Sequence, residues 1–258
     1  MQERHKDRKL YFQELAKTSK KYFIPYIQQF IEIKPEMRIL EIGCGDGGNL
    51  LPLSEMGCDV VGVDLAAERI TNAIAIFKEL GVKGTFLARD IFTIKEFEYG
   101  FDLIICHDVI EHVTDKETFL ANMRRYLKPN GIAFMSFPAW QMPFGGHQQI
   151  CTSKFLSHFP FMHLLPTCMY RGLLNMFHEP EGTINELLFI KTTGTTIEMF
   201  EKLTKQLNIT ILDRRLYFIN PHYETKFGLK PRRLVSFIGA IPWLRNFFTT
   251  SCFYMIKM

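Results

Sequence analysis

Short apolar runs alternate with helix-like segments over the first half of the chain. Five such runs, each long enough for one strand, lie at 38–42, 59–64, 84–88, 101–106 and 132–137. Continuous apolar runs of this length are typical of strands buried on both faces of a sheet. Helices are predicted between them at about 49–55, at 67–80, and from about 109 or 115 to 127. This alternation predicts a parallel sheet with connecting helices.

The rest of the chain does not follow this rhythm. Residues 7–33 are predicted to form a helical leader in two pieces, because Pro25 interrupts the helical pattern. The segment 139–190 is rich in Phe, Met, His and Pro and is expected to form a mostly helical insertion. A helix at about 195–206 and strands at 209–219 and near 252–257 follow. These late strands fit an antiparallel addition to the sheet edge.

Together these elements predict an α/β protein with a doubly wound, mostly parallel, Rossmann-like sheet. The predicted organisation has four parts: a helical leader at 1–35, an α/β core at 36–138, an insertion or cap at 139–190, and the completion of the core at 191–258. The cap follows the fifth strand, where ligands of open α/β sheets collect, so it is placed on the acceptor side.

Composition narrows the class of protein only slightly. The net charge of +4 is modest and argues against nucleic acid as a partner. The six cysteines are scattered without metal-ligand spacing, which predicts reduced thiols and a cytoplasmic location. No signal peptide and no spanning apolar segment is recognised. An excess of 24 Phe falls partly in the second half of the chain.

A glycine-rich turn follows the first predicted strand. Gly43, Gly45 and Gly47 precede a helix, and glycine lets the backbone approach a ligand closely at such a place. The same stretch also satisfies the dinucleotide pattern through Gly48. The turn alone therefore predicts an adenosine cofactor without deciding which one.

Two carboxylates stand at the ends of the next strands. Asp64 ends the second strand and is interpreted as the acceptor for both ribose hydroxyls, with helix capping as the alternative. Asp90 ends the third strand beside Ile91 and suits an adenine pocket, with a plain loop carboxylate as the alternative. A dehydrogenase has no need of an acid at the position of Asp90.

Several motifs in order resemble the class I S-adenosylmethionine-dependent methyltransferases, in particular quinone-biosynthesis and sugar O-methyltransferases. They are ILEIGCGDG (39–47), VD (63–64), ARDI (88–91), FDLIICHDVIEHV (101–113) and LKPNG (127–131). The resemblance implies S-adenosylmethionine as cofactor and a seven-stranded sheet with an antiparallel last strand. It implies these cofactor contacts: Glu41, Gly43 and Gly45 near the methionine part, Asp64 on the ribose, Asp90 and Ile91 at the adenine, and His107 beside the sulfonium. Gly47 and Leu65 are also expected to bind the cofactor.

The methyl acceptor is expected to be a hydroxyl of a saccharide, a quinone or a lipid-linked metabolite. His147 is the candidate general base, because histidine titrates near neutral pH and this one follows the fifth strand. His112 beside Glu111 is expected to order a helix start; two ligands do not make a metal site, so no metal is predicted. The Phe-rich insertion is interpreted either as an apolar lid or as a second core.

Alternatives remain at this level. One is a non-catalytic relative that only binds the cofactor, and another is an NAD-type dehydrogenase. The stretch 226–238 alternates basic and apolar residues, which suits either a weak contact with a membrane surface or a solvated face. The oligomeric state is not predicted.

Overall fold

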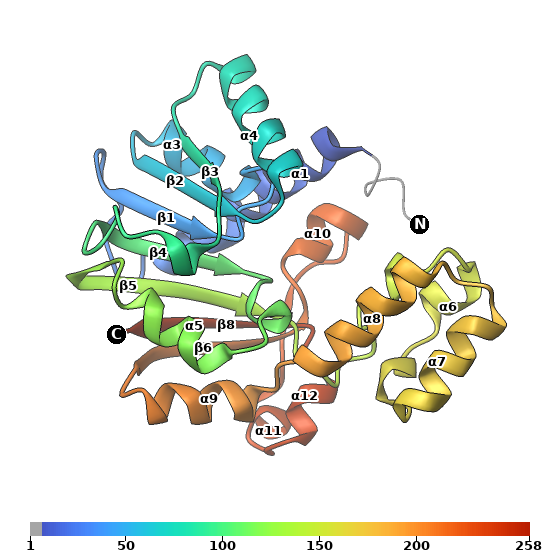
Figure 1. Ribbon diagram of the computed structural model, residues 1–258. Coiled ribbons are helices and arrows are strands. Elements are labelled where there is room, and N and C mark those ends of the chain that lie inside the picture. Colours follow the sequence, from blue (N-terminus) through green and yellow to red (C-terminus); the bar gives the residue numbers. More distant parts are fainter. Residues whose placement is uncertain (1–6) are drawn as a thin grey trace.

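The computed structural model describes residues 7–258. Figure 1 shows a twisted sheet with helices on both faces and a separate group of helices, the cap, to one side. The strand order is β3-β2-β1-β4-β5-β8-β6-β7. This is the predicted α/β architecture. The order reverses between β1 and β4, and ligands of doubly wound sheets bind at such a switch point.

Five parallel strands form the first part of the sheet. They are β1 (Arg38–Ile42), β2 (Asp59–Asp64), β3 (Thr85–Ala88), β4 (Phe101–His107) and β5 (Leu127–Phe137). Their side chains alternate between two cores, so that Leu40 packs in one and Ile39 in the other. Burial on both faces explains why the sequence reads as continuous apolar runs.

The late strands complete the sheet in antiparallel fashion. The last strand, β8 (Ser251–Lys257), lies between β5 and β6 (Thr210–Ile219) and is antiparallel to both. The antiparallel end is therefore as predicted. The sheet has eight strands rather than seven, because the two-residue β7 (Arg232–Arg233) pairs with the outer edge of β6.

Helices cover the two faces unequally. One face carries α5 (Lys116–Met123) and α9 (Ile197–Gln206). The other face carries the leader and two connecting helices: α1 (Arg8–Thr18), α2 (Ile24–Ile27), α3 (Leu51–Glu55) and α4 (Ala67–Leu80).

The leader differs from its prediction in detail. A π-helical turn at Ser19–Phe23 joins α1 to α2, so the helix is continuous through the expected break. Pro25 is the second residue of α2, directly after the π-helical turn, so this proline does not end the helix. The helix then ends at Ile27, six residues before the predicted end at Ile33.

The insertion is mostly helical, as predicted, and has a core of its own. It contains α6 (Lys154–His158), α7 (Thr167–Met176) and α8 (Glu181–Thr193). A separate apolar cluster lies between these helices: Cys151, Leu156, Met162, Tyr170, Leu174, Ile184 and Leu187. This cluster favours the second-core interpretation over a simple lid. The division of the chain into four parts stays a prediction.

Three short helices belong to the connection between β6 and β8. They are α10 (His222–Phe227), α11 (Ser236–Gly239) and α12 (Leu244–Phe247). Figure 1 shows α10 between the core and the cap. Within residues 7–258, none of the helices combines the length and the apolar character needed to cross a bilayer.

Candidate active site

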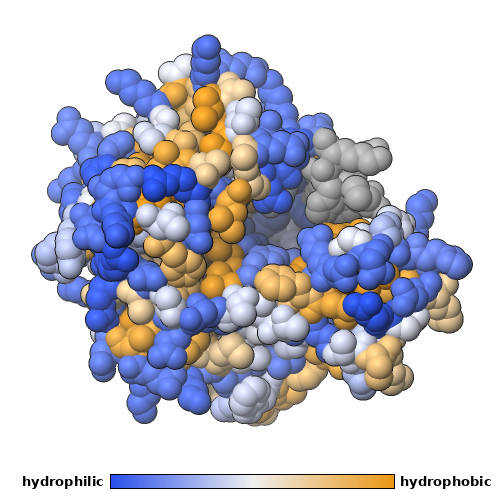
Figure 2. Space-filling view, viewed as in Figure 1, coloured by the Kyte–Doolittle hydropathy of each residue, from blue (hydrophilic) through white to orange (hydrophobic). Residues whose placement is uncertain are grey.

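A cavity of about 280 Å³ opens at the carboxyl ends of the first strands. In Figure 2 a hollow lies between the core and the cap, with hydrophobic residues along its core side. The predicted cofactor residues in the wall are Gly43, Asp64, Leu65, Asp90 and Ile91. The cavity thus lies where the order of the sheet reverses, as expected for a cofactor site.

The glycine turn has a geometry that only glycine accepts. Gly43 has a φ of +72°, and a Cβ there would lie 2.3 Å from Cγ2 of Val109. Its N–H donates to the carbonyl oxygen of Val63 at 2.7 Å, which fixes the turn to β2. Gly47 is also left-handed, with a φ of +83°. The backbone can therefore line the cavity without side chains in the way.

Asp64 is held in place by two backbone donors. Its Oδ2 accepts from the N–H of Gly45 and its Oδ1 from the N–H of Ala66, both at 2.8 Å. The cap residue of α4 is Ala66, without a side-chain cap bond, so Asp64 does not cap that helix. Each carboxylate oxygen keeps acceptor capacity for a further donor. Asp64 is thus oriented toward the cavity and able to accept two hydroxyls.

The adenine end combines a carboxylate with apolar neighbours. Asp90 Oδ1 accepts from the N–H of Phe92 at 2.9 Å, which orients the carboxylate at the start of a short helical turn. Ile91 is buried, whereas Leu65 is 77% exposed at the cavity mouth. Both apolar side chains line the same cavity as Asp90, which is the lining expected of an adenine pocket.

Glu41 and His107 lie behind the cavity wall rather than in it. Glu41 is buried, and its Oε1 accepts from Asn49 Nδ2 at 2.7 Å. Burial raises the pKa of Glu41 to about 8. The His107 ring packs on Phe23, with centroids 4.9 Å apart, and its Nε2 lies 3.5 Å from Asp108 Oδ2. Their expected cofactor contacts stay predictions.

Three charged residues of the cavity wall were not predicted as cofactor contacts: Arg69, Arg89 and Asp108. Arg69 reaches the cavity from the first turn of α4. Asp108 follows β4 in a left-handed conformation, with a φ of +54°, and its N–H donates to Ser136 O at 2.8 Å. A non-glycine residue in this region is uncommon and often functional. In the sequence, the place of Asp108 between β4 and Glu111-His112 was the signal that could have identified it as a site residue.

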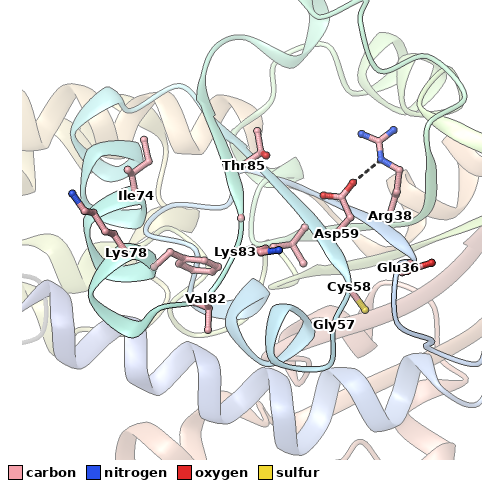
Figure 3. A pocket seen from close by; sticks show the side chains of 13 residues that line it. Glu36, Arg38, Gly57, Cys58, Asp59, Ile74, Lys78, Val82, Lys83 and Thr85 are labelled. Atoms are coloured by element: carbon pink, nitrogen blue, oxygen red, sulfur yellow. Dashed lines mark hydrogen bonds and ion pairs between the residues drawn. The ribbon is translucent and has the colours of Figure 1, made fainter.

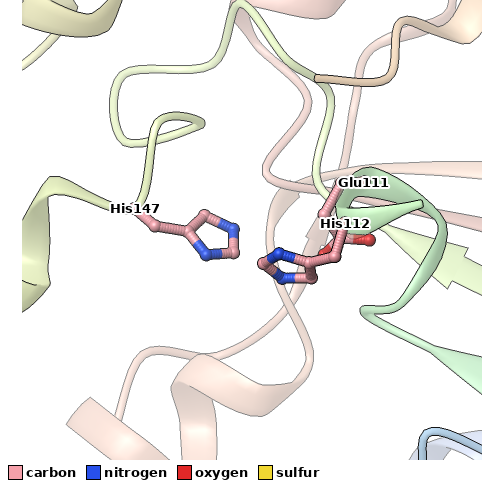
Figure 4. Close-up of side chains that lie close together, drawn as sticks. All are labelled: Glu111, His112 and His147. Carbon is pink, nitrogen blue, oxygen red and sulfur yellow. The ribbon is translucent and has the colours of Figure 1, made fainter. Parts of the chain in front are cut away.

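A cluster of three metal-ligand side chains borders this cavity. Glu111 and His112 come from the turn after β4, and His147 comes from the segment that follows β5. One ligand atom from each lies within 4.8 Å of the others. Figure 4 shows the two imidazoles facing each other, and their centroids are 5.0 Å apart. His147 thus adds a third side chain of a metal-binding type beside Glu111 and His112, which the sequence pattern lacked.

The position of His147 depends on tight packing of the preceding turn. Its φ is +58°, a left-handed conformation. A Cβ on Gly145 would lie 2.2 Å from Trp140 O, and one on Gly146 would lie 2.2 Å from His163 Cβ. Buried Gln148 donates from Nε2 to Pro143 O at 2.8 Å. These contacts fix the conformation of the turn 145–148. In this conformation the His147 side chain is directed toward His112.

Burial dominates the electrostatics of the cluster. Burial, and then the nearby charge of Asp108, raise the pKa of Glu111, both oxygens of which lack a hydrogen-bond partner among the described residues. Burial lowers the pKa of His112 and lowers that of His147 to about 3. Both imidazoles are therefore neutral at pH 7, the form that binds metals. A pKa of about 3 makes His147 a weak base.

The cap is connected to this cluster through a buried lysine. Lys116 Nζ donates to the carbonyl oxygens of Val113 and Thr193, at 2.6 and 2.5 Å. Burial lowers the pKa of Lys116 to about 8. The turn that carries Glu111 is thereby fixed to the end of α8.

A larger cavity lies elsewhere and lacks comparable chemistry. Its volume is about 780 Å³, and it lies at the amino ends of β1, β2 and β3. Figure 3 shows its side chains, including the ion pair of Arg38 Nε with Asp59 Oδ2 at 2.9 Å. It lies at the edge of the sheet opposite the glycine turn.

Comparisons with known proteins agree with this site. A family profile described as "Methyltransferase domain" matches residues 33–207. A ubiquinone biosynthesis O-methyltransferase of Rickettsia canadensis is 36% identical over 115 residues, which cover 45% of this chain and 48% of the relative. The chain thus spans about half the length of the curated relatives it matches.

Two solved structures share the fold. A SAM-dependent methyltransferase from Aquifex aeolicus has a TM-score of 0.51 at 13% identity, covering 91% of this chain and 89% of that one. The plantazolicin methyltransferase BpumL in complex with SAH has a TM-score of 0.56 at 16% identity, covering 96% and 84%. These identities establish the fold alone. By the family match, the chain belongs to the methyltransferase-domain family, and this match confirms the predicted cofactor, S-adenosylmethionine.

Proposed function

We propose that this protein transfers the methyl group of S-adenosylmethionine to a hydroxyl of a small acceptor, a saccharide, a quinone or a lipid-linked metabolite. One observation carries the proposal: a single cavity is lined by Asp64, Asp90 and His112, and His112 faces His147. The carboxylates assigned to the ribose and the adenine, Asp64 and Asp90, thereby share one cavity with His112, which can act on the methyl acceptor. The quinone class is supported by the names of the curated relatives.

The chain's main task in this reaction is positioning. A sulfonium is already an activated methyl donor, so the acceptor oxygen must be held in line with it. We infer that Glu111, His112 and His147 hold a divalent cation at this place. A carboxylate and two imidazoles are a ligand set found in catalytic sites with an open position. Such a cation would lower the pKa of an acceptor hydroxyl.

His147 is therefore proposed as a ligand rather than as the general base expected from the sequence. Its pKa of about 3 is far from the operating pH of a base at neutrality. The two unpaired oxygens of buried Glu111 support the same interpretation, since a buried carboxylate without a partner is costly. A cytoplasmic location belongs to this proposal and is supported by six cysteines, all without a disulfide.

The test is methyl transfer from labelled S-adenosylmethionine. The purified protein is incubated with a catechol, a monosaccharide and a polyprenylated phenol, each with and without Mn²⁺ or Zn²⁺. We expect label in a hydroxylated acceptor, loss of turnover after chelation, and recovery when the metal is restored. Cofactor binding without transfer to any acceptor, including those of a metabolite extract, would favour the non-catalytic alternative.

A further inference from the structure

The connection between β6 and β8 presents apolar side chains to solvent and turns polar ones inward. We call residues 229–248 the 229–248 surface. Its exposed large apolar residues are Leu229, Val235, Phe237, Trp243, Leu244, Phe247 and Phe248. Phe237 is 78% exposed and Trp243 is 60% exposed, whereas Arg245 and Asn246 are 6% and 0% exposed. This is the reverse of the usual distribution between surface and core.

Polar anchors explain how this reversed arrangement is held. Arg245 donates from Nε to Glu198 Oε1 at 2.9 Å and pairs with Glu201 at 2.8 Å. Asn246 Nδ2 donates to Glu198 Oε2 at 2.6 Å, and the N–H of Trp243 donates to Glu198 Oε1 at 2.8 Å. The carboxylates of α9 thus fix the backbone of α12, and the aromatic residues on either side of the anchors, Trp243, Phe247 and Phe248, are exposed.

The exposed charges of residues 229–248 are all positive. These residues contain four Lys or Arg and no Asp or Glu, and one of the four, Arg245, is buried and paired with Glu198 and Glu201. Lys230, Arg232 and Arg233 are exposed beside the aromatic side chains. A cavity of about 270 Å³ lies at the same place and is lined by Arg233 together with Arg214 and Arg215, which are paired with Glu201 and Asp213. Ser236 and Gly239 of α11 also line it, so the cavity and exposed Phe237 belong to one surface.

We propose that the 229–248 surface binds the surface of a bilayer that contains anionic phospholipid. Aromatic residues favour the interface between headgroups and acyl chains, and basic residues contact the phosphates. The positive charge of Lys230, Arg232 and Arg233 complements an anionic membrane surface, whereas a neutral membrane would not attract it. Figure 1 shows α11 and α12 side by side at one end of the molecule, next to α9. This inference does not depend on the proposed methyl transfer.

The experiment is co-sedimentation of the full chain with vesicles. Binding to phosphatidylcholine vesicles with about one-third phosphatidylglycerol is expected to be at least about 10-fold tighter than to phosphatidylcholine alone. Phe237→Ala/Trp243→Ala is expected to weaken it about 10-fold, and Arg232→Gln/Arg233→Gln about 30-fold at low salt. Met169→Ala/Met176→Ala, which removes exposed apolar side chains from the cap, is the matched control and should change it less than about 2-fold.

Tryptophan emission gives a second measurement. We expect a blue shift with anionic vesicles that is absent in Trp243→Phe, with Trp140 as the unchanged background. The absence of binding to anionic vesicles would overturn the proposal, as would an equal loss in the Met169/Met176 variant. The oligomeric state of the protein is also measured in the absence of lipid. If the protein is a dimer there and Phe237→Ala/Trp243→Ala converts that dimer to a monomer, the surface binds a second copy of the chain, and the membrane proposal is overturned.

Discussion

The two halves of the candidate site are built in different ways. The cofactor half is local: the glycine turn and Asp64 lie at the carboxyl ends of adjacent paired strands, β1 and β2. The acceptor half is assembled over distance, because His147 is brought to His112 by the packing of Trp140 and His163 around two glycines. A sheet register fixes the first half, whereas the fit of the cap fixes the second.

The largest expected effect is on cofactor affinity, and it is tested by comparing substitutions at the two ends of β2. Asp64→Ala removes the carboxylate assigned to the ribose and should weaken S-adenosylmethionine binding at least about 100-fold in calorimetry, since hydrogen bonds to charged groups are strong. Asp59→Ala, at the amino end of β2, is the control. Asp59 is exposed and pairs only with Arg38, so its removal should change the affinity less than about 2-fold. Equal losses would remove the special role of Asp64.

The next prediction concerns the acceptor half alone. His147→Ala should weaken Mn²⁺ or Zn²⁺ binding at least about 100-fold, because one of three ligands is lost. Cofactor affinity should stay within about 2-fold, since His147 does not line the cofactor cavity. His158→Ala is the control: His158 bonds only to Ser157 and Lys154 on its own helix. Unchanged metal binding in His147→Ala would refute the ligand role.

The different construction of the two halves also explains which parts of the site could be predicted from the sequence. The strands, the glycine turn and the acids at the ends of β2 and β3 could be predicted, because a parallel sheet places successive strand ends at one edge. The pairing of His147 with His112 could not, since 34 residues, including α5 and β5, separate them in the chain. Asp108 was missed although its place directly after β4 was a signal, because its left-handed backbone cannot be predicted from the sequence.

Two glycine substitutions, Gly145→Ala and Gly182→Ala, test whether tight packing of the turn holds His147 in position. Gly145→Ala places a Cβ 2.2 Å from a backbone oxygen, so turnover should fall about 10-fold or more while cofactor affinity is kept. Gly182→Ala in α8 is the matched change, since nothing lies within 4 Å of its Cβ. It should stabilise the fold by about 0.5–1 kcal/mol in denaturant unfolding. Turnover unaffected in Gly145→Ala would show that the turn adapts.

The smallest expected effect concerns pH and the buried carboxyl behind the cofactor half. The pKa of Glu41 is raised from its ordinary value of 4.5 to about 8, so between these two pH values the folded protein keeps a proton that the unfolded chain releases. Its stabilising contribution is complete below 4.5 and is lost as the pH rises through 8. Glu41→Gln should therefore raise the melting temperature at pH 9 by roughly 5 °C and change it little at pH 4. An equal shift at both pH values would contradict the assigned pKa.

The central claim is that the cavity at the switch point of the sheet binds S-adenosylmethionine. The most direct test is a crystal structure of the protein with this molecule. We predict both ribose hydroxyls within hydrogen-bonding distance of Asp64, the adenine beside Asp90 and Ile91, and the methyl group directed toward His112 and His147. An adenosyl group bound outside this cavity, or a ribose without contact to Asp64, would contradict the account.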